Sequence, residues 1–333
     1  MMNIAVMGAG SWATAFAALL AGAGIPVRLW ARRPEIAEAI TQAHENPEYH
    51  PGIRLPSALT ADADPHAVLA DADLVVLCVP AQSLRDNLAD WGAAMPAGST
   101  VVSLMKGIEL GSGLRMTEVI RDALGWPADR LTALSGPNLA REVLAGQPAA
   151  GTIAGPDEQV ARGVAELISG ARYRAYWTSD LIGTELAGAM KNVIAVANGC
   201  AVGLGFGENA QAALITRGLA EMTRLGVALG AQPVTYLGLA GVGDLIATCS
   251  SPLSRNRSFG VALGEGLSVA EATVRVRQTC EAIRSARPIV RLAADAGVAV
   301  PITEQVVRVV HEDMPPREML AAFMSRSVKA EGQ

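Results

Sequence analysis

The sequence predicts an α/β protein in which a doubly wound, Rossmann-type sheet at the N-terminus is followed by an all-α C-terminal domain. Three observations support this prediction. A glycine-rich turn joins a short apolar run to a helical pattern near the N-terminus, further apolar runs alternate with helical segments, and these runs stop near residue 180. The 333 residues suffice for about two domains, which we place at 1–180 and 181–333.

The first strand, turn and helix are predicted from the stretch 2–33, which has no charged side chain before Arg28. A secretion signal needs positive charge before its apolar core, whereas here the arginines follow it. A membrane helix needs about 20 predominantly apolar residues, and four glycines interrupt this run. A secreted or anchored protein would require this stretch to be cleaved or inserted, which sequencing of the mature N-terminus would detect.

A strand–turn–helix–strand unit explains more of these residues. The apolar "IAVMG" suits a buried strand, "GAGS" interrupts it, and "WATAFAALLAGAG" has helical spacing before "PVRLWARR" resumes as a strand. The turn has the G-x-G-x-x-A spacing of Gly8, Gly10 and Ala13. Gly8 permits the tight turn, Gly10 lets a pyrophosphate approach the backbone, and a small third residue lets helix and strand pack closely. The free N–H groups of the helix would hold the phosphates.

Two arginines end the second strand, where NAD-selective sites usually carry an acidic residue for the ribose 2′-hydroxyl. The guanidinium groups of Arg32 and Arg33 suit a 2′-phosphate instead. We therefore predict NADP(H) as the preferred cofactor, with NAD(H) as the second cofactor. The alternative is a solvated turn with two ordinary surface arginines.

Further strands and helices follow in alternation. The predicted strands are 72–80, 99–107, 130–138, 149–155 and 171–179, and the helical segments between them include 82–92 and 157–169. After Asp180 only helical patterns remain, beginning with 180–205 and 209–230.

Ligands of doubly wound sheets bind beyond the carboxyl ends of the strands, so polar residues there are candidates for the site. Lys106 and Asn138 follow two predicted strands, and the helical domain contributes Lys191, Asp244 and the run "SRNR". Since the net charge is −5, any site for an anion must gather its cations locally, and the composition gives no support for nucleic-acid binding.

Lys191 has a narrow, apolar surround on its predicted helix. Its neighbours three and four positions away are Ala187, Gly188, Ile194 and Ala195. Burial there would lower the pKa of the lysine and make it a usable proton donor. A lysine at a helix–helix edge that extends its ammonium group to solvent fits the same pattern, and spacing leaves both interpretations open.

The run "SPLSRNRS" predicts a helix with Ser254 as its N-cap and Arg255 and Asn256 in its first turn. Free N–H groups, a guanidinium and an amide together suit a phosphate. A capped helix with a basic, solvated first turn explains the run as well, and taken alone the run favours that simpler interpretation.

Two features argue against metal or disulfide chemistry. His44 and His50 lie beside Glu45 and Glu48 in a proline-containing loop, but they lack the helical H-x-x-x-H spacing of a metal site. The cysteines are scattered without a C-x-x-C pair, which is typical of buried, reduced thiols. They are Cys78, Cys200, Cys249 and Cys280.

Beyond these patterns, the chain resembles the bacterial-type NAD(P)-dependent glycerol-3-phosphate dehydrogenases over essentially its whole length. The resemblance rests on an ordered set of segments: "GAGSWATA", "NPEYHPGIRLP", "SLMKGIE", "SGPNLAREV", "ELAGAMKNVIAVANG", "GLGFGENAQAALITRGLAEM", "GLAGVGDLIATCSSPLSRNRSFG" and "PITEQV". It implies dinucleotide binding by residues 1–180 and substrate binding and catalysis by residues 181–333.

The resemblance also implies site residues, with Lys191 as the catalytic lysine. The implied cofactor contacts are Gly8, Gly10, Ser11, Trp12, Arg32, Arg33, Lys106, Ala140, Arg255 and Glu281. The implied substrate contacts are Lys106, Gly136, Asn138, Lys191, Asp244, Ser254, Arg255 and Asn256. The sequence departs from the family pattern at Ala13 (usually glycine), at Asn138 (usually a hydroxyl residue) and at Ala282 (usually glycine), and the last departure bears on the neighbouring Glu281.

The activity implied is reversible reduction of dihydroxyacetone phosphate to glycerol 3-phosphate, which feeds glycerophospholipid synthesis. Arg255 and Asn256 would hold the substrate phosphate, Lys191 would donate a proton to the carbonyl oxygen, and Asp244 and Lys106 would orient Lys191 and the substrate. We expect a cytoplasmic enzyme with a small-molecule substrate, no metal, no nucleic acid and no membrane insertion, and we leave open whether it forms a homodimer.

Two other classes of protein share parts of this pattern. Other two-domain reductases, of the β-hydroxyacid dehydrogenase or ketopantoate reductase type, also carry a lysine in a helical domain, but the "SRNR" run favours a phosphorylated substrate. A non-catalytic NADPH-binding sensor would keep the N-terminal turn but would not need Lys191, Asp244 and Arg255 together.

Overall fold

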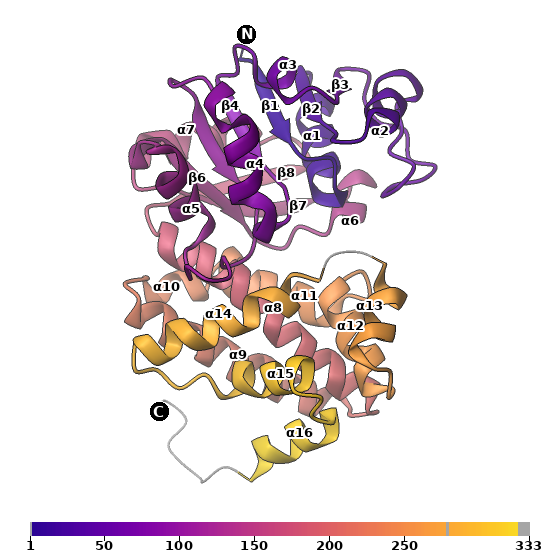
Figure 1. The fold of residues 1–333 in the computed structure, drawn as a ribbon, viewed down its shortest axis with the longest axis vertical. Helices are drawn as coiled ribbons and strands as arrows, with labels where there is room; N and C mark the ends of the chain where they lie inside the picture. Colours follow the sequence, from indigo (N-terminus) through magenta and orange to yellow (C-terminus); the bar gives the residue numbers. More distant parts are fainter. Residues whose placement is uncertain (1, 278–279, 326–333) are drawn as a thin grey trace.

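The structure, a computed structural model, describes residues 2–277 and 280–325, and places a sheet with covering helices above a layer of helices (Figure 1). The sheet has the strand order β3-β2-β1-β4-β5-β6-β7-β8. Its strands are β1 Ile4–Met7, β2 Val27–Trp30, β3 Leu59–Asp62, β4 Leu74–Leu77, β5 Thr100–Ser103, β6 Leu131–Ser135, β7 Ala149–Ala154 and β8 Tyr173–Thr178. The described strand pairs are parallel except β6 and β7, which are antiparallel.

Helices cover both faces of this sheet, as expected of a doubly wound fold. They are α1 Ser11–Gly22, α2 Pro34–Glu38, α3 Pro65–Leu69, α4 Leu84–Trp91, α5 Met116–Leu124, α6 Ala140–Leu144 and α7 Glu158–Ile168. Ile4 and Val6 of β1 belong to a core that includes residues of α1 and α7, whereas Ala5 and Met7 belong to another that includes residues of α4 and α5. Short one-turn helices lie at Ala39–Ala43, Ala81–Ser83, Gly92–Ala94 and Ala128–Arg130.

The predicted fold class is confirmed, with one strand missed by the sequence analysis. Strand β3 lies at the edge of the sheet, and its sequence "LTAD" has a single buried residue, so no apolar run marks it. The last strand, β8, ends at Thr178, and α8 begins at Leu181, at the place where the strand pattern stops. Residues 278–279 and 326–333 of the second predicted domain lie outside the described residues.

The lower layer is built around α8 Leu181–Gly203, which runs through its core. The other helices are α9 Glu208–Ala228, α10 Pro233–Tyr236, α11 Asp244–Ser250, α12 Arg255–Gly264, α13 Val269–Val276, α14 Glu281–Asp295, α15 Pro301–His311 and α16 Pro316–Met324, with a further turn at Leu239–Gly243. By length and composition α8 could cross a membrane, but 89% of its most apolar window is buried inside the protein, which is typical of a core helix.

Helices α8 and α12 touch through glycines. A Cβ at Gly260 would lie 2.2 Å from the carbonyl oxygen of Val196, and a Cβ at Gly199 would lie 2.2 Å from that of Arg257. Residues 203 and 264 repeat this contact one turn further along both helices. The two helices therefore run side by side in the same direction, and the N-terminus of α12 lies beside the middle of α8, where Lys191 is found.

Candidate active site

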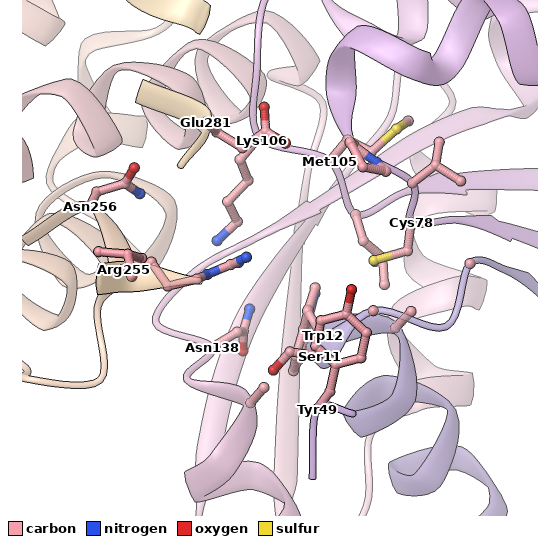
Figure 2. A pocket seen from close by; sticks show the side chains of 18 of the residues that line it. Ser11, Trp12, Tyr49, Cys78, Met105, Lys106, Asn138, Arg255, Asn256 and Glu281 are labelled. Atoms are coloured by element: carbon pink, nitrogen blue, oxygen red, sulfur yellow. The ribbon is translucent and has the colours of Figure 1, made fainter. Parts of the chain in front are cut away.

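A cleft of about 1230 Å³ lies between the carboxyl ends of the strands and the helical layer, where the sequence analysis expected a site (Figure 2). Among the described residues that line it are nine basic side chains and two carboxylates, although the chain as a whole is acidic. The basic residues are Arg32, Arg33, Lys106, Arg141, Lys191, Arg255, Arg257, Arg275 and Arg284, and the acidic residues are Glu48 and Glu281. The cleft is thus suited to an anionic ligand.

The glycine turn between β1 and α1 forms one wall of the cleft. Gly8 has a φ of +126°, and a Cβ there would lie 2.4 Å from the carbonyl oxygen of Cys78, so a side chain would clash. Gly10 is the N-cap of α1, and a Cβ at this position would meet no atom within 4 Å. Helix α1 has no side-chain cap and no acidic residue in its first turn. Ala13, which belongs to that turn, is fully buried. These features fit the pyrophosphate of a dinucleotide.

The loop that carries His44 and His50 is hydrogen-bonded to the glycine turn and the start of α1. Asn46 donates to the carbonyl oxygen of Ala9 (3.0 Å) and to Oγ1 of Thr14 (2.9 Å), and buried His50 donates from Nε2 to the carbonyl oxygen of Ser11 (2.9 Å). Burial lowers the pKa of His50, which keeps the ring neutral. In the described part of the chain, no three His, Cys, Asp or Glu residues are grouped in a way that could hold a metal.

The two arginines after β2 differ in their surroundings. Arg33 forms an ion pair with Glu48 of the loop and a longer contact of 3.9 Å with Glu35. Arg32 makes no hydrogen bond or ion pair with any described residue, and both arginines line the cleft. Arg32 therefore offers the less compensated positive charge to an incoming phosphate.

Two lysines and one aspartate form the polar centre of the cleft. Lys191 donates to Oδ1 of Asp244 (2.8 Å) and to Oγ1 of Thr248 (2.7 Å), whereas Lys106 donates to Oδ2 of Asp244 (2.6 Å) and to the carbonyl oxygen of Gly136 (3.0 Å). The carboxylate lies behind the two ammonium groups and is only 2% exposed. It bridges the sheet and the helical layer, and it directs two positive charges toward one region of the cleft.

Burial shapes the acidity of this group. Burial lowers the pKa of Lys191 to about 8, with the nearby charge of Lys106 acting in the same direction and Asp244 opposing it. Burial alone would raise the pKa of Asp244, but the charges of Lys106 and Lys191 outweigh it and keep that pKa below its usual range. At neutral pH the site thus holds an ionised carboxylate beside a lysine that gives up its proton readily. Of the two interpretations that the spacing left open for Lys191, the structure shows the buried one.

The start of α12 forms the opposite wall. Ser254 caps the helix by accepting a hydrogen bond from the backbone N–H of Arg257 (3.3 Å), as expected from its position. Figure 2 shows Arg255 extending into the cleft, where its tip lies between Lys106 and Asn138 in this view. The amide of Asn256 donates to Oδ1 of Asn192 (2.9 Å).

A chain of side-chain amides continues from this point. Oδ1 of Asn256 accepts from the thiol of Cys280 (2.9 Å) and from the backbone N–H of Ala282 (3.3 Å). Asn192 in turn donates to the carbonyl oxygen of Lys106 (3.3 Å). Asn256 therefore holds α12, α8 and the start of α14 together, in addition to lining the cleft.

Asn138 lies on the sheet side of the cleft. Its Oδ1 accepts a hydrogen bond from the hydroxyl of Tyr173 (3.0 Å), and its Nδ2 is buried without a partner in the structure. Figure 2 shows the amide nitrogen directed toward the cleft. A buried amide without a partner costs about 1–3 kcal/mol, so a bound acceptor would be favoured there.

Glu281 reaches the cleft from the first turn of α14. Its Oε1 accepts from the backbone N–H of Ala81 (3.4 Å), and its Oε2 is buried without a partner. Burial raises the pKa of this carboxyl, and Arg255 and Arg284 act against the rise. The backbone N–H of the next residue, Ala282, donates to Oδ1 of Asn256, and Glu281 itself lines the cleft.

The structure brings most of the predicted site residues into one cleft. Those that line it are Gly8, Gly10, Ser11, Trp12, Arg32, Arg33, Lys106, Asn138, Ala140, Lys191, Ser254, Arg255, Asn256 and Glu281. Gly136 and Asp244, predicted as substrate contacts, are not among the lining residues; Gly136 accepts a hydrogen bond from Lys106, and Asp244 accepts from both lysines. Sequence reasoning did not single out Tyr49, Asn192 or Thr248, which also line the cleft, and it considered Glu48, another lining residue, only for a metal site. Thr248 follows Asp244 by one helical turn, and this spacing could have indicated it.

Comparison with known proteins agrees with this geometry. The models of the N-terminal and C-terminal parts of NAD-dependent glycerol-3-phosphate dehydrogenase match residues 3–161 and 180–321, respectively. A glycerol-3-phosphate dehydrogenase (NAD(P)+) of Thermobifida fusca is 56% identical over 332 residues, which cover 99% of each chain. The crystal structure of glycerol-3-phosphate dehydrogenase from Coxiella burnetii is 37% identical, with a TM-score of 0.93 over 98% of this chain and 99% of that chain.

A more distant structure shares the fold alone. The ketopantoate reductase of Ralstonia eutropha is 19% identical, with a TM-score of 0.60 over 97% of this chain and all of that chain. The matches to the N-terminal and C-terminal family models together account for nearly the whole chain: the first covers the sheet from β1 to β7, and the second covers the helical layer. The chain belongs to the NAD-dependent glycerol-3-phosphate dehydrogenase family.

Proposed function

We propose that this protein catalyses the reversible, NAD(P)H-dependent reduction of dihydroxyacetone phosphate to glycerol 3-phosphate, a precursor of glycerophospholipids. The main support is the Lys106–Asp244–Lys191 cluster, which faces the same cleft as the glycine turn and Arg255. Reduction of a ketone adds a hydride at carbon and a proton at oxygen. When bound, the nicotinamide cofactor supplies the hydride.

The side chains of the cleft supply the rest. Lys191 donates the proton to the carbonyl oxygen as negative charge develops there, while Asp244 and Thr248 hold its ammonium group in place. Arg255 and the first turn of α12 bind the substrate phosphate. Lys106 adds a second positive charge, positioned by Asp244 and the carbonyl of Gly136. In the oxidative direction, neutral Lys191 accepts the proton.

The substrate phosphate provides the direct test of this function. With NADPH, we expect the purified protein to reduce dihydroxyacetone phosphate but to act on unphosphorylated dihydroxyacetone at least about 10²-fold less well in kcat/KM, because Arg255 then has no anion to bind. The measurement is the loss of nicotinamide absorbance with each ketone. Equal rates with the two ketones would contradict the proposal. Turnover of a ketoacid such as ketopantoate in place of the phosphate ester would favour the reductases that share the fold, and cofactor binding without turnover of either would favour a sensor.

The same observations support a preference for NADPH over NADH, carried mainly by Arg32. We expect Arg32→Ala to lower kcat/KM for NADPH by about tenfold, with less effect on NADH, because a charge-assisted contact to the 2′-phosphate is lost. Arg33→Ala should cost less, since Glu48 already neutralises Arg33. Arg28→Ala is a suitable control, because Arg28 donates hydrogen bonds to the carbonyl oxygens of Ala67 and Ala70 and does not line the cleft. An unchanged preference in Arg32→Ala would show that the arginine is only a surface residue.

Tyr173 is expected to act on the substrate through Asn138. In Tyr173→Phe the amide of Asn138 loses the bond that fixes its orientation, so we expect KM for dihydroxyacetone phosphate to rise by about three- to tenfold with a smaller change in kcat. Tyr236→Phe is the matched control, because the hydroxyl of Tyr236 is equally buried but has no partner in the structure. A KM that is equal in both variants would contradict this role.

We further propose that residues 1–180 and 181–333 are two domains, that the protein works in the cytoplasm on a small-molecule substrate, and that it forms a homodimer. The division is supported by the end of the sheet at Thr178 and by the separate hydrophobic cores on either side of it. Size measurement in solution would test the dimer.

A further inference from the structure

The acidic residue that NAD-selective sites carry at the end of the second strand is absent from that position, where Arg32 and Arg33 stand. We propose that Glu48, from the separate loop that follows α2, takes its place and sets how far the enzyme favours NADPH over NADH. This inference rests on the proposed function, because it concerns the cofactor of that reaction.

The position of Glu48 supports this role. Its carboxylate forms an ion pair with Arg33, and both side chains line the cleft at the end of β2. The side chain of Glu48 remains 38% exposed, so it is within reach of a ligand. Among the described residues that line the cleft it is one of two carboxylates, and the other, Glu281, belongs to the far wall on α14.

The loop around Glu48 is held in place on both sides. Two residues before it, Asn46 bonds to the carbonyl oxygen of Ala9 and to Thr14, and two residues after it, His50 bonds to the carbonyl oxygen of Ser11. These partners belong to the glycine turn and the first turns of α1, which would bind the pyrophosphate. The distance from Glu48 to the phosphate-binding turn is therefore set by the loop, much as it would be for a residue on β2.

The chemistry of the two cofactors differs only at the ribose 2′ position. A 2′-hydroxyl can donate a hydrogen bond to the carboxylate of Glu48, whereas a 2′-phosphate is repelled by it and attracted by Arg32 and Arg33. Glu48 also neutralises Arg33 and so weakens the attraction further. The arginines and Glu48 thus act in opposite directions, and together they allow both nucleotides to bind.

The test is a charge series at one position: Glu48→Gln and Glu48→Lys. Dissociation constants of NADPH and NADH are measured by nicotinamide fluorescence, together with kcat/KM for dihydroxyacetone phosphate reduction. We expect the ratio of NADPH to NADH affinity to rise by about three- to tenfold in Glu48→Gln and further in Glu48→Lys. Glu38→Gln is the control, since Glu38 is an exposed residue of α2 that does not line the cleft, and the loss of its charge should leave the ratio unchanged.

The outcomes separate the two hypotheses. A ratio that stays flat across the series, or that rises equally in Glu38→Gln, would overturn the role of Glu48. If the wild-type protein binds both nucleotides but does not reduce dihydroxyacetone phosphate, the proposed function fails, while the dissociation constants still decide whether Glu48 controls cofactor choice.

Discussion

Lys191→Met is expected to lower kcat for dihydroxyacetone phosphate reduction by about 10³-fold, while the affinity for NADPH changes little. The reason is that the proposed mechanism takes its proton from this buried ammonium group, whose pKa is about 8, and methionine keeps the volume of the side chain without that proton. Asp244 retains Lys106 as an ion-pair partner in this variant, so we expect the fold to persist. Steady-state kinetics and nucleotide titration would measure the two effects.

Asn198→Ala serves as the matched control for Lys191→Met. Asn198 lies seven residues later on α8, is fully buried, and donates to the carbonyl oxygen of Cys249 (3.0 Å) without lining the cleft. Its loss should lower the melting temperature but leave kcat nearly unchanged, because it removes a structural hydrogen bond. Near wild-type turnover in Lys191→Met would remove Lys191 from the mechanism.

Asp244→Asn is expected to shift the pH dependence of the reaction toward lower pH. In the proposed mechanism reduction requires protonated Lys191, so kcat/KM of the wild-type enzyme should fall as the pH rises through about 8. The charge of Asp244 favours the protonated form of Lys191, and its removal also leaves the like charge of Lys106 unopposed. The falling limb should therefore move down by about 1–3 pH units.

Stability should fall in the same variant, by about 3–5 kcal/mol, because the buried ammonium group of Lys191 and the partly buried one of Lys106 lose their counter-charge. Asp180→Asn separates this effect from the pH shift. Asp180 is also buried, but its carboxylate caps α8 through Gly183 and bonds to Gln232 and Thr235, with no lysine among these partners. We expect it to lower stability without moving the pH profile. A falling limb at the same pH in Asp244→Asn and wild type would show that the carboxylate does not control Lys191.

The parts of the site that lie close together in the sequence were predictable. The spacing of Gly8, Gly10 and Ala13 identified the dinucleotide turn, because that motif depends on local backbone geometry. The capping role of Ser254 was likewise evident from its neighbours within one helical turn, whereas the neighbours of Lys191 left its burial open. Lys106 and Asn138 were placed correctly because polar residues that follow parallel strands gather at one edge of a sheet.

The remaining features depend on contacts between distant segments, for which the sequence has no periodic signal. The hydroxyl of Tyr173 reaches Asn138 from the strand at the sheet edge, and Glu48 reaches Arg33 from a loop without regular structure. The position of Asp244 behind the lysines follows from the packing of α11 against α8, which no pattern of residues along α11 reveals. Strand β3 was missed because three of its four residues are at least partly exposed.

The glycine contact between α8 and α12 affects the site although glycines carry no reactive group. Lys191 is carried by one helix and Arg255 by the other, and the spacing between them is set by backbone touching backbone at Gly199 and Gly260. A single methyl group at either glycine would push the helices apart. A displacement of reacting groups by about 1 Å can lower the rate by about 10²-fold. Redesign of this cleft for another substrate is therefore constrained by a fixed spacing between Lys191 and Arg255, and a change in that spacing would require both helices to be rebuilt.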